Sequence, residues 1–344
     1  MKLSRDRLFA GRLIYAVVTL MAITAFNFTV FAISATSTAE AAKKNSLTVA
    51  MALTPLSAPV IIAQKRGFFA ANGLNVTIKD VSGGHRAIRT IFEGKADIST
   101  SSEVVVMFKS MTRSDFSIIC SFVSSDKDTK IVAHKDSGIQ TIKDLVGKRV
   151  GTVTGTSAQF FLDQTLLFGG VNSSSVKVVH IDPEEAPVFL ASKKVDAIAV
   201  WEPYAYLTRV KLGNQAVVIP HERNYTETFN AIALKSFVAS HPATIEKFLA
   251  ALLQAVSFIN DNPEETQHIV AQRIDQDHNF IKSVWSDFTF GITMHQWLIT
   301  TLESEARWAV AAGHIDQRMI PNYLDYLYLD ALERLKPENI TIYR

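Results

Sequence analysis

Apolar runs alternate with segments of helical spacing along the first part of this chain. Residues 47–52 form a continuous apolar run typical of a buried strand, whereas residues 74–81 alternate between apolar and polar positions. Strands and helices are expected in turn at residues 47–52, 59–71, 74–81, 88–93, 96–100, 104–111 and 117–123. This order predicts α/β units around a mostly parallel sheet.

The same order of elements then begins again. Residues 149–182 repeat the strand, threonine-bearing loop, phenylalanine-rich helix, glycine turn and second strand of residues 47–80. The repeat predicts two similar α/β lobes of ordinary domain size. Because no low-complexity linker separates them, the lobes are expected to be joined by short crossing segments near residues 131–134 and 229–234.

Within the repeat, an aspartate is followed six positions later by a glutamate in each copy. The pairs are Asp97 with Glu103 and Asp196 with Glu202. Helix starts are also readable in the second copy, where Thr141 precedes Asp144 and Asp182 precedes Pro183 and Glu185 in capping-box patterns.

The last third of the chain is predicted to be mainly helical. From Pro242 onward, apolar residues recur at spacings of three, four and seven, which predicts a stripe that packs on the core. Further helices are expected from Pro263, at residues 294–312 and at residues 323–335.

The N-terminus has the pattern of a secretory signal peptide. Basic residues precede the apolar segment 13–33, and small residues follow it up to Ala41. Cleavage after Ala41 would place the mature protein in the periplasm or another extracytoplasmic compartment. An uncleaved membrane anchor is the alternative, because the apolar segment is long.

Composition removes several classes of function. The formal net charge of +2 gives no drive toward nucleic acid, and a single cysteine excludes an internal disulfide, a multi-cysteine zinc site or an iron-sulfur cluster supplied by this chain alone. Cys120 lies in an apolar run and is expected to be a buried, inert thiol. The nine histidines show no metal-ligand spacing, so no metal or cofactor is expected.

Residues 151–161 combine a strand end, a glycine turn and a helix start. Gly155 permits a tight turn, and Thr156 with Gln159 fits a capping box. The N-terminus of a helix attracts anions, although such junctions also occur without any ligand in many α/β proteins. The pattern therefore allows either an anion site or a purely structural turn.

Five separated motifs resemble the nitrate, sulfonate and taurine group of ABC-transporter substrate-binding proteins, which also includes binders of thiamine-pyrimidine precursors. They are IAQKRGFF at 62–69, GLNV at 73–76, GKADI at 94–98, DLVGKRVG at 144–151 and WEPY at 201–204. The resemblance implies a type II periplasmic-binding-protein-like fold, with two α/β lobes, two crossing segments and a ligand cleft. It places lobe 1 at residues 42–131 and 233–344, and lobe 2 at residues 132–232, after a signal peptide at 1–41.

The resemblance also implies a function. The protein would bind a small polar or anionic ligand, such as nitrate, a sulfonate or taurine, by lobe closure, and would deliver it as a monomer to the membrane permease of an importer whose ATPase acts on the far side. Binding of a pyrimidine precursor or another heterocycle, or a membrane-tethered sensor, are the alternatives. An enzyme is the least favoured class, because the cysteine-rich motif of catalytic relatives is missing and no catalytic triad can be nominated.

Ligand residues are expected where strand ends face the cleft. The candidates are Thr54, Ser57, Gly83, Gly84, His85, Arg86, Ser101, Ser102 and Glu103 from lobe 1, and Gly155, Thr156, Ser157, Trp201 and Glu202 from lobe 2.

Each charged candidate also has a structural interpretation. Arg86 could clamp an anion or remain solvated at a helix start, and Trp201 could wall the pocket or pack in the core. Glu202 is expected to cap local backbone and pair with an arginine rather than bind an amine. Glu103 and Glu202 together would disfavour a bare anion, so a zwitterionic or mixed polar ligand fits as well.

Overall fold

The computed structural model describes residues 46–222, 225–316 and 319–343. The predicted signal peptide at 1–41 lies outside these residues. Residues 47–344 form one compact unit.

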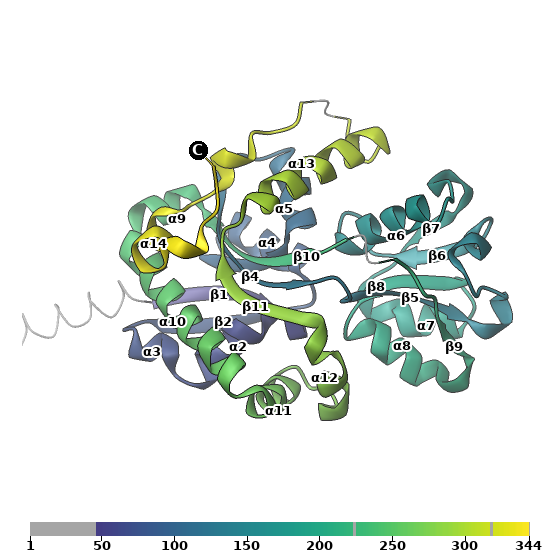
Figure 1. Cartoon of the computed structure of the whole chain (residues 1–344), viewed down its shortest axis with the longest axis horizontal. Coiled ribbons are helices and arrows are strands. Elements are labelled where there is room, and N and C mark those ends of the chain that lie inside the picture. The colour runs from purple at the N-terminus through teal and green to yellow at the C-terminus, as the bar shows by residue number, and fades with distance from the viewer. Residues whose placement is uncertain (1–45, 223–224, 317–318, 344) are drawn as a thin grey trace, which may run out of the picture. The chain divides into compact units, whose positions relative to one another are not determined.

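The first sheet has six strands in the order β11-β4-β10-β3-β1-β2 (Figure 1). Strands β1 and β3 run parallel, whereas β10 lies antiparallel between β3 and β4. The bounds are β1 Ser46–Ala52, β2 Asn75–Val81, β3 Ile98–Ser102, β4 Phe116–Ser125, β10 Glu227–Leu234 and β11 Phe288–Thr293. The sheet is therefore mixed, because a strand returning from the other sheet inserts into its middle.

The second sheet has five strands in the order β7-β6-β8-β5-β9. Strand β6 is parallel to β7 and β8, whereas β5 is antiparallel to β8 and β9. The bounds are β5 Thr129–His134, β6 Arg149–Thr152, β7 Lys177–His180, β8 Ala197–Trp201 and β9 Ala216–Val218. We call the first sheet with its packed helices lobe 1, and the second sheet with its helices lobe 2.

The helices that concern the site and the core follow these strands. They are η1 Pro55–Ser57, α2 Ala58–Lys65, α3 Phe68–Ala71, α4 Gly84–Phe92, α5 Glu103–Ser110, α6 Ser157–Phe168, η5 Pro183–Glu185, α7 Ala186–Ala191, α8 Tyr204–Leu212, α9 Lys235–Ser240, α10 Pro242–Asp261, α11 Pro263–Arg273, α12 His278–Val284, α13 Gln296–Ala311 and α14 Asp330–Leu335.

The chain passes between the sheets at residues 126–128, after β4, and returns between β9 and β10. Residues 131–134, predicted as a crossing segment, belong to strand β5 of lobe 2, and residues 229–234 belong to strand β10 of lobe 1. Both predicted crossings were placed a few residues too late, because apolar runs that belong to strands β5 and β10 were taken as the crossings, whereas the chain crosses just before each of these strands.

The repeat is visible in equivalent contacts. The carboxylate of Asp97 accepts a hydrogen bond of 2.7 Å from the backbone N–H of Thr48 in β1, and that of Asp196 accepts one of 2.8 Å from the backbone N–H of Arg149 in β6. Each aspartate lies just before the third strand of its repeat, β3 or β8. It therefore links the start of that strand to the first strand of the repeat, β1 or β6.

Two predicted helices are interrupted. The expected helix at 59–71 divides into α2 and α3 at Gly67, whose φ of 73° is a left-handed value that ends a helix. The expected helix at 323–335 divides because Tyr328 donates its backbone N–H to the carbonyl of Ile118 in β4, so that Leu327 forms an isolated bridge with Ile118. A local periodicity cannot reveal this pairing with a distant strand.

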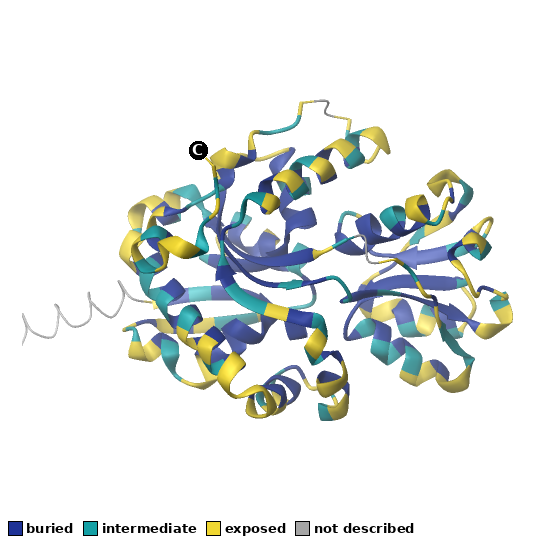
Figure 2. Cartoon of the chain, viewed as in Figure 1, coloured by how far each residue is buried: buried dark blue, intermediate teal, exposed yellow. Residues whose placement is uncertain are grey.

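The apolar stripe of α10 is buried in lobe 1, as predicted. Ile245, Phe248, Leu249 and Leu252 have no exposed surface, and the burial follows the sheet-facing side of the helices (Figure 2). By length and hydropathy alone α10 could cross a membrane, but a core helix meets the same criteria.

Candidate functional site

A small cavity lies between the two lobes, at the ends of β1, β3 and β8 and at the starts of α4, α6 and β10. Eight of the residues predicted from the sequence line it, namely Thr54, Gly83, Gly84, His85, Ser102, Thr156, Ser157 and Trp201. Five further lining residues are Leu56, Val105, Asp128, Glu227 and Phe229. The wall therefore mixes apolar and polar groups and takes contributions from both sheets.

Two glycines bring α4 close to the cavity. Gly83 has a φ of 79°, and a Cβ there would lie 2.8 Å from the His85 ring. A Cβ on Gly84 would lie 2.7 Å from the Cα of Ser101 in β3. Gly84 therefore lets the helix start approach β3, and Gly83 leaves room for the ring of His85.

The start of α6 forms the opposite wall. The Thr156 hydroxyl donates to the carbonyl of Val153 at 2.6 Å and accepts from the N–H of Ala158 at 3.3 Å. The side chain of Gln159 accepts from the N–H of Gly155 at 2.7 Å, not from the N–H of Thr156 as the predicted capping box requires. Two of the backbone donors at this helix start are thus satisfied by side chains.

His85 and Trp201 meet edge to face across the cavity, with ring centroids 6.3 Å apart. Burial, with Arg86 and Arg89 nearby, lowers the pKa of His85 to about 4, so that the ring is neutral at pH 7. The Nδ1 atom of His85 and the Nε1 atom of Trp201 have no hydrogen-bond partner among the described residues.

Two carboxyl groups that the sequence analysis did not nominate also line the cavity. Asp128, at the first crossing, is 2% exposed, and Glu227, at the first residue of β10, is 4% exposed. Burial raises the pKa of Asp128 to about 8; Lys130 lowers it in part, and Glu202 and Asp287 raise it further. Burial, followed by Asp128 and Glu103, raises the pKa of Glu227 well above its usual value.

Arg86 does not line the cavity. Its guanidinium donates to Asp182 and Glu184 of lobe 2 at 2.7 Å each, and also contacts the hydroxyl of Ser82. These partners lie about a hundred residues away along the chain, so sequence analysis could not pair them with Arg86.

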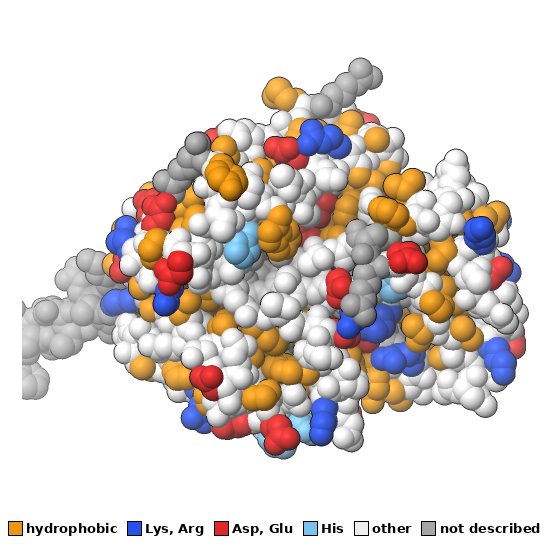
Figure 3. Space-filling view, viewed as in Figure 1, with side chains coloured by type: hydrophobic (Ala, Val, Ile, Leu, Met, Phe, Trp, Pro, Cys, Tyr) orange, Lys and Arg blue, Asp and Glu red, His pale blue; other side chains and the backbone are white. Residues whose placement is uncertain are grey.

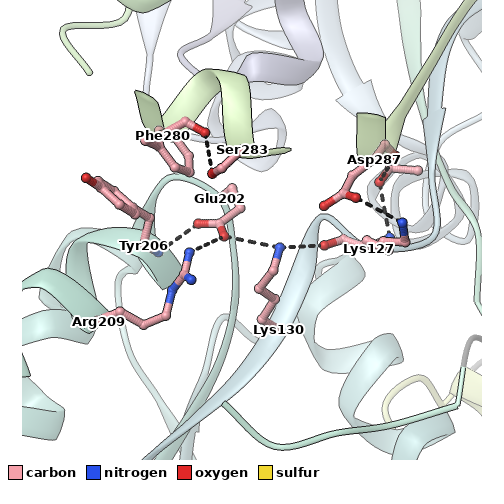
Figure 4. Close-up of polar contacts among 9 residues, drawn as sticks. Lys127, Lys130, Glu202, Tyr206, Arg209, Phe280, Ser283 and Asp287 are labelled. Atoms are coloured by element: carbon pink, nitrogen blue, oxygen red, sulfur yellow. Dashed lines mark hydrogen bonds and ion pairs between the residues drawn. The ribbon is translucent and has the colours of Figure 1, made fainter. Parts of the chain in front are cut away.

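Glu202 is fully buried but is not part of the cavity wall. Its carboxylate accepts from the N–H of Tyr206 at 2.7 Å and contacts Lys130 at 3.1 Å and Arg209 at 3.2 Å (Figure 4). This combination of backbone capping and pairing with an arginine matches the structural interpretation of Glu202.

Glu103 occupies the corresponding place at the start of α5 and is also fully buried outside the cavity wall. It accepts from the backbone N–H and the hydroxyl of Thr228, at 2.6 and 2.9 Å, and from the hydroxyl of Tyr225. Burial nevertheless raises its pKa. Glu103 thus anchors the returning chain to lobe 1.

The remaining three candidates lie behind the wall. The hydroxyl of Ser57 donates to the carbonyl of Ala52 at 2.6 Å, and Ser101 is buried against Gly84. Gly155, with a φ of 75°, forms the turn before α6. All three are next to or near residues that line the cavity, in η1, in β3 and in the turn before α6.

The missed residues share a signal that the sequence does contain. Asp128 lies in the polar stretch 124–130 between two apolar runs, and Glu227 precedes the mainly apolar run of β10. An acidic residue beside each crossing would have pointed to the cavity, had the crossings been placed correctly.

Comparison with known proteins gives a family match and several relatives of known name. Residues 54–266 match the family model described as NMT1/THI5 like. A Bacillus subtilis (strain 168) protein named "Putative aliphatic sulfonates-binding protein" is 24% identical over 231 residues, which cover 66% of this chain and 69% of that protein. The 4-amino-5-hydroxymethyl-2-methylpyrimidine phosphate synthase of Schizosaccharomyces pombe is 23% identical over 231 residues, 62% of this chain and 64% of the enzyme.

Among solved structures, the periplasmic aliphatic sulphonate binding protein SsuA of Escherichia coli superposes with a TM-score of 0.70 at 16% identity. The match covers 83% of this chain and 98% of SsuA. The chain therefore has the periplasmic-binding-protein fold that the sequence motifs imply.

Proposed function

Because the chain belongs to the NMT1/THI5-like family, we propose that it is an extracytoplasmic solute-binding protein of an ABC importer. It binds a small polar ligand between its lobes and delivers the ligand to a membrane permease. Relatives named as binding proteins for sulfonates support this role.

The observation that carries the proposal is the cavity at the strand ends of both sheets. Ligands of open α/β sheets bind beyond the carboxyl ends of the strands, and the wall holds unpartnered polar atoms of His85, Asp128 and Trp201. A ligand that contacts both lobes favours the closed arrangement, because it binds that arrangement more tightly.

Pyrimidine binding is the second candidate, since a fungal relative is named as a pyrimidine phosphate synthase. The indole of Trp201 and the ring of Phe229 at the cavity wall would suit a flat heterocycle. Catalysis is not proposed. In the described residues no cluster of three or more His, Cys, Asp or Glu side chains could hold a metal ion, and the single cysteine is buried.

A thermal-shift screen of the mature protein with small anions, amines, zwitterions and pyrimidines tests the role. A ligand at about a hundred times its Kd stabilises the folded state by about 2.7 kcal/mol. The effect should disappear in Trp201→Ala and persist in Trp297→Ala, which alters a 37% exposed tryptophan outside this cavity. If no compound in a broad small-molecule library raises Tm, the proposed function fails.

A further inference from the structure

The cavity contains buried carboxyl oxygens without partners, although the Glu227 carboxyl group also has a hydrogen bond with Ser157. Both carboxyl oxygens of Asp128, and Oε2 of Glu227, have no hydrogen-bond partner among the described residues. Leaving such a group unpaired in a buried place costs free energy unless it is neutralised or meets a donor. A ligand with N–H donors would satisfy these oxygens.

The protein does not supply the balancing positive charge at the wall. Among the described residues that line the cavity there is no lysine or arginine. Lys130 contacts Glu202 at 3.1 Å, and Arg86 is held by the two carboxylates of η5. An anion entering this cavity would meet two acidic side chains, the neutral ring of His85 and no lysine or arginine.

Aromatic side chains at the cavity wall also favour a cationic ligand. The indole of Trp201 and the ring of Phe229 line the same cavity, and the face of an aromatic ring attracts an ammonium or amidinium group. The unpartnered Nε1 of Trp201 is a donor, so it suits an acceptor elsewhere on the ligand.

We infer that the ligand carries a protonated nitrogen, as an ammonium or amidinium group, which Asp128 and Glu227 bind. The inference rests on the proposed function and narrows its ligand class. The rest of the ligand is small, because the cavity is small, and it offers an acceptor to the unpartnered Nε1 of Trp201. An anion without such a nitrogen is not its ligand.

Matched pairs of probes test the inference by calorimetry and thermal shift. Ethanolamine is compared with ethylene glycol, acetamidine with acetamide, and taurine with ethanesulfonate, alongside the broad library. Each protonated member should bind at least about tenfold more tightly than its partner, because its N–H groups pair with buried carboxylates. Equal or tighter binding of the uncharged or anionic members overturns the inference, yet leaves the proposed function standing.

Isosteric variants locate the interaction. Asp128→Asn and Glu227→Gln should each weaken binding of the protonated probes, or of a protonated ligand found in the library, by at least about tenfold. The exposed controls Asp325→Asn and Glu264→Gln should leave it unchanged. Unaltered affinity in both cavity variants overturns the inference.

The direction of the pH dependence gives a readout that does not rely on variants. Asp128 is faced by Lys130, Glu202, Asp287 and Glu227, and its burial favours the protonated acid. A cation requires the ionised carboxylates, so its affinity should rise from about pH 6 to about pH 9 with release of protons. An affinity that falls over this range would show an anion bound by the protonated acids, and would overturn the inference.

Discussion

The guanidinium of Arg86 lies 2.7 Å from the carboxylate of Asp182, and this contact joins α4 of lobe 1 to η5 of lobe 2. Glu184 makes a second contact at 2.7 Å. The three side chains are 32 to 53% exposed, so solvent and salt weaken the pairs. Acidic and basic side chains are also interspersed over the face of the molecule that Figure 3 shows.

Removing this link should weaken ligand binding only modestly. Arg86→Ala loses two partly exposed ion pairs worth about 1 kcal/mol or less each, so affinity should fall by roughly two- to tenfold. The loss should shrink between about 0.02 and 0.5 M NaCl. Calorimetry with the ligand found by screening measures both.

The double variant Asp182→Asn with Glu184→Gln separates two interpretations of Arg86. If Arg86 links the lobes, the double variant weakens binding as Arg86→Ala does. If Arg86 instead clamps an anionic ligand, releasing it from the carboxylates should strengthen binding of that ligand, and the lobe-linking interpretation would then be wrong.

Glu202→Gln should destabilise the folded protein by about 3 kcal/mol. The change leaves Lys130 and the partly exposed Arg209 without a buried counter-charge, and removal of one partner from a buried ion pair is costly. Urea unfolding measures the loss, with the exposed Glu264→Gln as the matched control. A change below about 0.5 kcal/mol would contradict the structural role of Glu202.

Gly84→Ala should cost about 1 to 3 kcal/mol of stability and shift α4 away from β3, because its Cβ would meet the backbone of Ser101 at 2.7 Å. Gly291→Ala is the matched control, since its nearest neighbour would be the Thr293 methyl at 3.6 Å. Thermal unfolding compares the two. Equal effects of both substitutions would argue against a close approach at Gly84.

Asp128 should make the ligand-free protein less stable as pH rises. Its folded pKa of about 8 exceeds the usual value near 4, so the folded state binds more protons between these values. The stability it contributes is complete below about pH 4 and is lost as pH rises through about 8. Urea unfolding should show a flatter pH profile for Asp128→Asn, together with a gain in stability relative to the wild type at about pH 8. An unchanged profile would contradict the assignment.

Cys120 should not react with thiol reagents in the native state. The thiol is fully buried, and burial raises its pKa to about 12, which suppresses the reactive thiolate. A disulfide-exchange chromophore should label it only after unfolding in urea. Rapid labelling of the folded protein would show that the β4 region opens readily.

Local patterns were enough to predict much of the fold. The capping boxes at Thr141 and Asp182 form, and the stripe of α10 is buried, because both depend on residues a few positions apart. The repeat of Asp97 and Asp196 was also readable, and both side chains make the same kind of strand contact.

Eight of the fourteen candidate site residues line the cavity for a related reason. They follow strand ends, and the α/β order of the sequence already assigns strand ends to one edge of each sheet. Thr54 after β1 and Trp201 at the end of β8 are examples.

Only the tertiary structure decided the charge of the cavity. Arg86 is drawn to Asp182 and Glu184 on the other lobe, and Glu202 is drawn to Lys130 from a neighbouring strand. Because of these pairings, neither Arg86 nor Glu202 lines the cavity. The acidic side chains that do line it are Asp128 and Glu227. Sequence spacing determines which residues share a helix or a strand end, but Coulombic pairing and burial depend on distances between segments that lie far apart in the chain.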